Sequence, residues 1–303
     1  MKYAVGVDIG GTKTAIGVVN EKGEPIVHET IVTDLTISPE AMINRMIDTV
    51  NTLIEKSDIS HDAIIGIGVG APGPLDSFNG IITCPPNLPE WRDIPLKKMM
   101  EAAFSFPVKV ENDANAAALA EGWIGGGQDV SNYVYMTIST GIGAGIITEG
   151  QLLRGRKGNA GDIGHIVVNP AYGTCPCGQK GCLEWIASGT AIARIGSDII
   201  GRTISTKDVF DLYDEGHKEI VAFVEDVLTS IGQACVTLIN TFDTEKIIIG
   251  GGVTQVGDLL FNSIRQYVSQ FALNPDGRQV EIAESTIGAH NGLIGAAALW
   301  LDQ

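Results

Sequence analysis

Carboxylate and amide side chains gather in one short run of the sequence, Glu111-Asn112-Asp113-Ala114-Asn115. The run follows an apolar stretch that begins at Val108 and precedes an alanine-rich stretch, so we expect a strand to end and a helix to begin there. Helix capping explains one of these side chains, because Asn and Asp are favoured N-caps, but it does not require several. A carboxylate at such a strand end can accept the proton of an alcohol that attacks phosphorus, while a neighbouring amide orients the hydroxyls.

Glycine-rich turns provide a second kind of candidate site. Gly10, Gly11, Thr12 and Lys13 follow Asp8 between two expected strands, so their uncovered amides and the Thr12 hydroxyl can wrap phosphate oxygens. Asp8 can hold Mg²⁺ directly or through water, since that ion prefers oxygen ligands. An ordinary hairpin, with glycines for positive φ, explains the same residues equally well.

Two further glycine runs repeat this layout. Thr140 and Gly141 open a second turn after an expected strand, and two such hairpins facing each other would clamp a triphosphate. Gly251 and Gly252 belong to a third run, which follows a buried strand and precedes a helix. Bare backbone there can lie against an adenine or a ribose, although close packing of helix and strand is an equally good explanation.

Familiar phosphate-binding motifs do not account for these turns. The sequence contains neither G-x-x-x-x-G-K-[ST] nor the H-R-D and D-F-G motifs of protein kinases. A literal G-x-G-x-x-G occurs over residues 68–73, but Pro72 and Pro74 stand where a helix with free amides should begin. A dinucleotide site is therefore disfavoured.

Soft metal ligands form a third group. His165, Cys175, Cys177 and Cys182 make up one histidine and three thiols, a ligand set typical of structural Zn²⁺ in tetrahedral geometry. Unmetallated thiols and a redox pair are the alternatives, the latter disfavoured because C-x-C is not the C-x-x-C spacing. We expect the two remaining cysteines, Cys84 and Cys235, to be buried as small apolar residues.

Composition limits what these groups can serve. The chain has 303 residues, 44% of them hydrophobic, and a net charge of −16, so phosphate backbones would be repelled and nucleic acid is an unexpected partner. No apolar run approaches the ~18 to 20 residues of a membrane span, and the N-terminal residues enter a strand pattern without a leader-like segment. We therefore expect a soluble cytoplasmic protein without a membrane partner.

The elements that position these groups form an α/β pattern in two lobes. Three strands over 3–9, 14–20 and 25–32 open the chain as an antiparallel meander, and a helix capped by Ser38 follows. Residues 133–148 repeat the pattern of a strand, a glycine turn and a return strand. We predict an N-terminal lobe of residues 1–113 plus the C-terminal helix at about 290–303, and a C-terminal lobe of residues 114–289 with the cysteine loop.

Six motifs together resemble the ROK family of sugar kinases and repressors over essentially the whole chain. They are D-I-G-G-T-K from Asp8, E-N-D-A-N-A from Glu111, T-G-I-G-A-G from Thr140, A-G-D-I-G-H from Ala160, C-P-C-G-Q-K-G-C-L-E from Cys175 and I-I-I-G-G-G from Ile247. The resemblance implies a two-lobed actin-like, hexokinase-type fold of the ribonuclease H-like class, with the active site in the cleft between the lobes. It also implies phosphorylation of a hexose by ATP and Mg²⁺, and a homodimer.

The resemblance also implies roles for single residues. Asp113 would deprotonate the sugar hydroxyl, usually the 6-hydroxyl, and His165 would bind both Zn²⁺ and the sugar. The other residues implied at the sugar are Gly73 through its amide, Asn87, Asn112, Asp162 and Glu184, and those implied at ATP are Asp8, Gly10, Gly11, Thr12, Lys13, Thr140, Gly141, Gly251 and Gly252.

One departure from the family motif affects substrate choice. The family usually has Glu where this sequence has Asp162, so the carboxylate reaches one methylene less far towards the sugar. Glucose is the first expected substrate, and another hexose or an amino or acylamino hexose is the alternative. The repressor branch of the family carries an N-terminal DNA-binding module. We expect no such module here, because the first hairpin already starts at Asp8. A catalytically silent sugar sensor is the third possibility.

Overall fold

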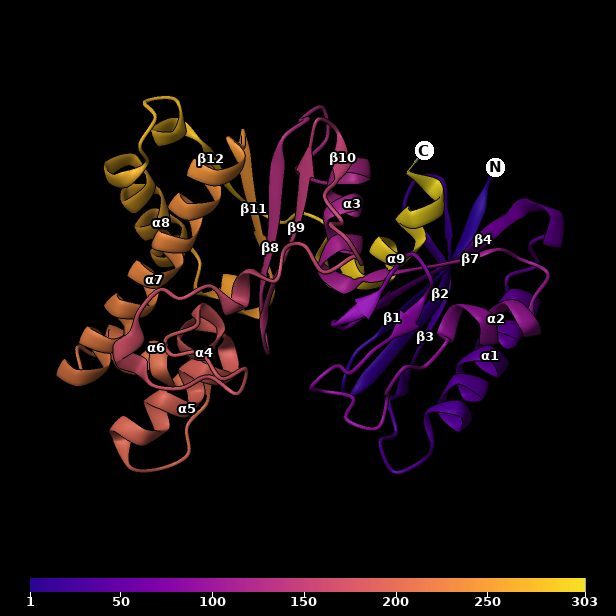
Figure 1. The fold of residues 1–303 in the computed structure, drawn as a ribbon, viewed down its shortest axis with the longest axis horizontal. Coiled ribbons are helices and arrows are strands. Elements are labelled where there is room, and N and C mark those ends of the chain that lie inside the picture. The colour runs from indigo at the N-terminus through magenta and orange to yellow at the C-terminus, as the bar shows by residue number, and fades with distance from the viewer. Residues whose placement is uncertain (303) are drawn as a thin grey trace. The chain divides into compact units, whose positions relative to one another are not determined.

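The computed structural model describes residues 1–302, which form two compact units (Figure 1). Unit 1 comprises Met1–Asp129, Leu152–Ala160 and the residues from Thr286 onward, and unit 2 comprises Val130–Gln151 and Gly161–Ser285. Each unit contains one five-stranded sheet with helices packed on it. The fold is therefore the two-lobed α/β arrangement that the motifs predict.

The sheet of unit 1 combines an antiparallel meander with two parallel strands. Its strand order is β3-β2-β1-β4-β7, in which β1 pairs antiparallel with β2 and parallel with β4. The parallel strands β1, β4 and β7 end at one edge of the sheet, because Asp8 pairs with Gly70 and Ala71 with Asn112. The strands are β1 (Tyr3–Ile9), β2 (Lys13–Asn20), β3 (Pro25–Val32), β4 (Ile64–Ala71) and β7 (Val108–Asn112), and a separate hairpin joins β5 (Leu75–Asp76) to β6 (Ile81–Ile82).

Helices cover both faces of this sheet, because successive side chains of β1 point to opposite faces and are buried on both. Val5, Val7 and Ile9 belong to the core shared with α1 (Pro39–Lys56) and α2 (Leu96–Ala103). Ala4, on the other face, packs with α9 (Asn291–Leu301), and α9 also packs against α3 (Asp113–Ile124). The Ser38 cap of α1 is confirmed, since its side chain accepts from Ala41 N.

Close approach of α9 explains part of the glycine excess. A Cβ at Gly68 would collide with the carbonyl oxygen of Ala296, and one at Gly66 would collide with the Trp300 ring. The first glycine of the literal G-x-G-x-x-G run therefore allows close packing of the helix. The short strand β5 follows just after Gly73, where a dinucleotide-binding motif would have a helix. Packing against α9 thus explains Gly68 without a ligand.

Unit 2 repeats the sheet pattern of unit 1. Its order is β10-β9-β8-β11-β12, with β8 antiparallel to β9 and parallel to β11, and β11 parallel to β12. The same sequence of pairings thus occurs twice in the chain. The strands are β8 (Tyr133–Ile138), β9 (Ile142–Thr148), β10 (Gln151–Leu152), β11 (Lys246–Gly250) and β12 (Glu281–Glu284).

Helices make up most of the remainder of unit 2. The longest, α7 (Lys218–Phe242), has the length and hydropathy of a membrane span, which the composition argument had excluded for any segment. It packs against α4, α5, α6 and α8, and 61% of its most apolar window is buried, as in the central helix of a globular core. The other helices are α4 (Leu183–Ala187), α5 (Gly189–Ile200), α6 (Thr206–Asp214) and α8 (Asp258–Phe271).

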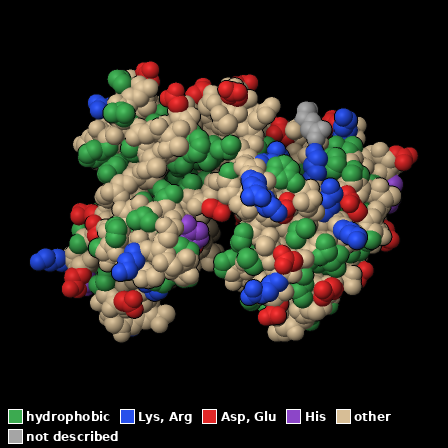
Figure 2. Space-filling view, in the orientation of Figure 1, with side chains coloured by type: hydrophobic (Ala, Val, Ile, Leu, Met, Phe, Trp, Pro, Cys, Tyr) green, Lys and Arg blue, Asp and Glu red, His purple; other side chains and the backbone are tan. Residues whose placement is uncertain are grey.

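Short 3₁₀ helices complete the chain. They are η1 (His61–Ala63), η2 (Ile163–His165), η3 (Pro170–Tyr172), η4 (Gly252–Val256), η5 (Gly277–Gln279) and η6 (Gly288–His290). Acidic and basic side chains are interspersed over the face of the molecule drawn in Figure 2.

The division into units differs from the predicted lobes in two places. Helix α3 belongs to unit 1, because its alanine-rich side packs against α9, so the first stretch of unit 1 ends at Asp129 instead of near residue 113. The segment Leu152–Ala160 also belongs to unit 1, which no sequence pattern predicted. Cys84 is exposed, contrary to expectation, whereas Cys235 is fully buried.

Candidate active site and metal centre

The first glycine turn is a tight hairpin at the end of β1. Gly10 N donates to the carbonyl oxygen of Lys13 at 2.9 Å, which closes the turn. The Cβ position of Gly11 lies 3.1 Å from Cβ of Asn87. The backbone of the turn therefore contacts the loop with Asn87, which the family resemblance implies at the sugar. A side chain at residue 11 would push Asn87 away, which explains glycine at this position.

Asp8 and Asp113 flank the same point at the edge of the sheet. The Cβ position of Gly70 lies 3.7 Å from Oδ1 of Asp8 and 3.8 Å from Cα of Asp113. This closeness follows from the parallel pairing of β1, β4 and β7, which aligns their carboxyl ends. Asp113 is exposed, as a residue that meets a substrate must be.

The Asp8 carboxyl has an unusual acidity. Its pKa is raised from 3.8 to about 7, mainly by burial and also by the charge of the neighbouring Asp113, while the charge of Lys13 acts in the opposite direction. The start of α9 packs closely against this carboxyl, since a Cβ at Gly292 would collide with Oδ2 of Asp8. A partly buried oxygen ligand of this kind is suited to a divalent cation, whose charge favours the ionised form.

Replacing Asp8 with Asn should therefore stabilise the metal-free protein at neutral pH. The folded-state pKa lies above the unfolded value, so the stability associated with the protonated carboxyl is full below pH 4 and is lost as pH rises to about 7. Asn resembles the protonated form, and we expect Asp8→Asn to raise the free energy of unfolding by about 2 to 4 kcal/mol at pH 8. Urea unfolding at pH 4 and pH 8 without Mg²⁺ measures this, and an equal difference at both pH values would contradict it.

Asn112 uses one end of its amide to build the site. Its Oδ1 accepts from Ala114 N at 3.0 Å and from Asn115 N at 3.2 Å, so it is the N-cap of α3. Its Nδ2 lies 3.3 Å from the Cβ position of Gly73, at the end of β4. Capping thus fixes the side chain while directing an amide donor towards Gly73, next to Asp113 in the sequence.

The second and third glycine turns come together in unit 2. Ser139 N donates to the carbonyl oxygen of Gly141 at 2.9 Å, and β11, which carries the third turn, pairs with β8 beside it. Gly251 has a φ of +93°, and a Cβ there would collide with the carbonyl oxygen of Ile138. Glycine is therefore required at residue 251 for both its conformation and its close packing.

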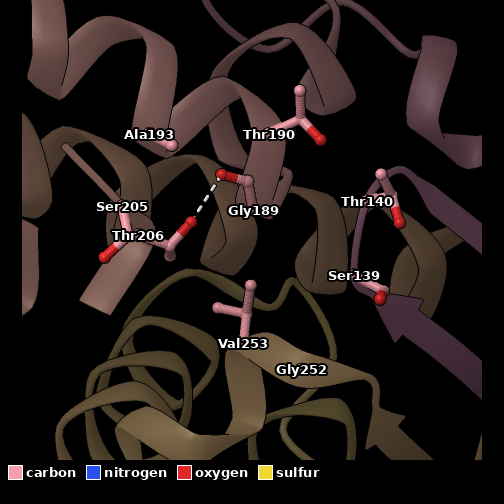
Figure 3. Close-up of a pocket in the computed structure, with 9 residues that line it drawn as sticks. All are labelled: Ser139, Thr140, Gly189, Thr190, Ala193, Ser205, Thr206, Gly252 and Val253. Atoms are coloured by element: carbon pink, nitrogen blue, oxygen red, sulfur yellow. Dashed lines mark hydrogen bonds between the residues drawn. The ribbon is translucent and has the colours of Figure 1, made fainter. Parts of the chain in front are cut away.

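A cavity of about 540 Å³ opens next to these turns (Figure 3). Its size is that of a small-molecule site. On one side Thr206 Oγ1 donates a hydrogen bond of 2.7 Å to the Gly189 carbonyl oxygen, and the Val253 side chain points towards these two residues. Three of the lining residues, Thr140, Gly252 and Ser139, lie in turns that the sequence had singled out. The others come from η4 and from α5 and α6 with its N-cap, and were missed: Gly189, Thr190, Ala193, Ser205, Thr206 and Val253.

Glu184 contacts the second turn directly. Its Oε2 accepts from Ile142 N at 2.8 Å and lies 2.5 Å from the Cβ position of Gly141. Burial raises the pKa of Asp162, the charge of His165 lowers it and that of Glu184 raises it. The charges of His165 and Glu184 thus both act on the Asp162 carboxyl, as expected of residues that bind one ligand.

The four predicted zinc ligands converge. One ligand atom from each of His165, Cys175, Cys177 and Cys182 lies within 4.8 Å of every other. Nδ1 of His165 is 3.8 Å from Sγ of Cys175, and the Sγ atoms of Cys177 and Cys182 are 3.5 Å apart. Ligands about 2.0 to 2.3 Å from one tetrahedral Zn²⁺ are separated by similar distances, so the residues fit this ion.

The cysteine loop is tied to the sugar-site candidates. Leu183 N donates to the Ile166 carbonyl oxygen at 2.9 Å, which holds the chain after His165 beside the chain after Cys182. Glu184 lies in the first turn of α4, two residues after Cys182, which is the N-cap of that helix. The loop also contacts the helices, since Tyr172 donates its hydroxyl to Asp226 of α7 at 2.7 Å. A metal in this loop would therefore fix the positions of His165 and Glu184.

The chain is similar to known proteins over nearly its whole length. The chain matches the ROK family over residues 4–303. It is 36% identical to a glucokinase from Halalkalibacterium halodurans, over 99% of this chain and 94% of the relative. A ROK family glucokinase from Streptomyces griseus, solved with glucose and AMPPNP, is 32% identical with a TM-score of 0.81 over 98% of each chain. A xylose repressor from Caldicellulosiruptor bescii is 29% identical over 97% of this chain and 77% of its own length. The chain belongs to the ROK family.

Proposed function

We propose that this protein phosphorylates a hexose with ATP, and that its first substrate is glucose at the 6-hydroxyl. The observation that carries the proposal is the exposed Asp113 beside the partly buried Asp8, at the aligned ends of three strands. Glucokinases at 36% identity and a relative solved with glucose and a nucleotide analogue support the same reaction. Phosphoryl transfer depends mainly on positioning and charge neutralisation, which this arrangement of carboxylates and backbone amides supplies.

Asp113 would act as the general base in this reaction. Its carboxylate accepts the proton of the sugar hydroxyl as the hydroxyl oxygen bonds to the γ-phosphorus of ATP, while the bond from that phosphorus to ADP breaks and ADP leaves. Asn112 and the Gly73 amide orient the hydroxyls next to it, and we assign Asn87 to the same group. When bound, Mg²⁺ neutralises charge on the phosphates, and Asp8 would hold it directly or through water.

Each unit carries glycine turns suited to parts of a nucleotide. Gly10, Gly11, Thr12 and Lys13 offer amides, a hydroxyl and a cation to the phosphates, as do the amide and hydroxyl of Thr140 and the amide of Gly141. The cavity in Figure 3 has the right size for the base and ribose, which would lie against Gly251 and Gly252.

Sugar recognition would depend on the cysteine loop. We assign Asp162, Glu184 and the ring nitrogen Nε2 of His165 to the sugar hydroxyls, because Nδ1 faces the thiols. Zn²⁺ bound to His165 and the three cysteines would have a structural role, since all four of its positions are taken by the protein. The ion thus shapes the sugar site without entering the chemistry.

The identity of the sugar is the part of this proposal most open to test. ADP release with ATP and Mg²⁺ should be measured across glucose, mannose, fructose, glucosamine and N-acetylated hexosamines. We expect glucose to give the highest kcat/KM. A hexosamine preferred over glucose would identify the alternative substrate class and would assign the shorter Asp162 to that selectivity.

The Asp162→Glu substitution tests that residue separately. If the shorter carboxylate determines how a hydroxyl near the anomeric carbon is held, Glu should change KM for the sugar about 10-fold and leave KM for ATP unchanged. The control is Asp48→Asn on the exposed side of α1, which should alter neither constant. Equal changes in the KM values for sugar and ATP would contradict a role of Asp162 in sugar selection.

The repressor branch of the family offers the second candidate function, supported by the xylose repressor. The net charge of −16 opposes binding to DNA. A gel shift at low salt distinguishes the two functions, and we expect no complex.

We also propose that the protein is a cytoplasmic homodimer. Light scattering should then give a mass of twice the chain mass of 32.0 kDa.

A further inference from the structure

A segment between two parts of unit 2 is anchored in unit 1 beside Asp113. Residues Leu152–Ala160 follow β10 and lead into Asp162 and His165. Asn159 donates to the Leu75 carbonyl oxygen at 2.9 Å and accepts from Leu75 N at 3.0 Å. Lys157 forms an ion pair of 2.8 Å with Asp76. These contacts fix the segment to β5, which begins just after Gly73.

The strongest of these anchors reaches the start of α3. Nε of Arg154 lies 2.8 Å from Oε2 of Glu111, whose side chain is only 2% exposed. The other oxygen, Oε1, accepts from Asn112 N at 3.0 Å and from Nδ2 of Asn115 at 3.1 Å. Both Asn residues flank Asp113. Glu111 therefore connects Arg154 to the backbone before Asp113 and to the first turn of the helix after it.

A buried carboxylate keeps this role only while its charge is compensated. Within the part of the chain that the structure describes, Arg154 forms the ion pair that compensates the charge of Glu111. Without that cation the carboxylate must recruit water or a proton, and its hydrogen bonds to Asn112 and Asn115 would change. The backbone that carries Asp113 would then shift or become less ordered.

We propose that Arg154 is a positioning residue for Asp113, acting through the Glu111 carboxylate. This inference rests on the proposed function, since it assigns Arg154 to the same phosphoryl transfer. Arg154 differs from the residues assigned to the sugar or ATP, because its guanidinium contacts the Glu111 carboxylate. A small displacement of a general base reduces turnover strongly while binding is retained.

The test is the steady-state kinetics of Arg154→Met, Arg154→Lys and a double variant that adds Glu111→Gln to Arg154→Met. We expect Arg154→Met to lower kcat about 10- to 100-fold and to change KM for sugar and ATP less than threefold. Lys should restore part of kcat, because it keeps the charge. The double variant removes the uncompensated charge, so it should fold even if Arg154→Met does not, and it should keep the low kcat.

The matched control is Lys157→Met, which breaks an ion pair of equal length on the same segment. Its kcat should remain within twofold of the unsubstituted protein. Folded Arg154 variants with normal kcat, a change confined to KM, or an equal loss of kcat in Lys157→Met would each overturn the inference while leaving the proposed function intact. Absence of turnover in the unsubstituted protein would overturn both.

Discussion

Asp113→Asn should lower kcat for sugar phosphorylation by about 10³-fold, because Asn cannot accept the proton of the attacking hydroxyl. The substitution keeps the size of the side chain and an oxygen that can accept from Ala114 N, a contact of 2.8 Å in the structure. We therefore expect the melting temperature and the dissociation constant for the sugar to change little. The measurements are kcat by coupled assay, thermal unfolding, and sugar binding by calorimetry.

The matched control for Asp113→Asn is Asp48→Asn, the same chemical change at an exposed position of α1. It should keep full turnover. Turnover of Asp113→Asn within about tenfold of normal would remove Asp113 from the role of base, whatever the reaction proves to be. A variant that neither turns over nor binds the sugar would instead indicate that Asp113 holds the substrate.

Loss of zinc should have the second largest effect. Cys182 is fully buried and lies two residues before Glu184, so removing the ion frees both Glu184 and His165. We expect Cys182→Ala, or exposure to a strong chelator, to raise KM for the sugar at least 100-fold and to lower the melting temperature. KM for ATP should change less. Metal analysis of the unsubstituted protein, purified without chelator, should find about one zinc per chain.

Cys84→Ser is the control for this prediction, because Cys84 is exposed and lies outside the cluster of ligands. It should keep its zinc and its KM for the sugar. A zinc content far below one per chain in active unsubstituted protein would contradict a structural zinc site. Restoration of sugar binding when zinc is added back to the chelated protein would separate loss of the ion from irreversible unfolding.

Local signals predicted the parts of the fold that depend on near neighbours in sequence. Ser38 before Pro39 marked the start of α1, and the glycines after Asp8 marked the first turn, because caps and tight turns are specified within a few residues. The cysteine cluster was also predictable, since three of its four ligands lie within eight residues. Its convergence with His165 in the structure confirms the grouping.

Contacts between distant residues could not be predicted in this way. Arg154 is 43 residues from Glu111 in sequence, and Asn159 is 84 residues from Leu75, so no spacing rule connects them. The boundary near residue 113 was misplaced for a related reason, because only packing against α9 shows that α3 belongs to unit 1. Gly189 and Thr206 likewise line one cavity only because α5 and α6 meet there.

The most direct test of the proposed function is the formation of glucose 6-phosphate from glucose and ATP by the zinc-loaded protein. Glucose 6-phosphate dehydrogenase and a separate ADP assay measure the two products in parallel. The account predicts equal amounts of both products, dependence on Mg²⁺, and loss of both in Asp113→Asn. Folded, zinc-loaded protein that forms ADP from ATP without phosphorylating glucose or any other hexose of the panel would contradict it.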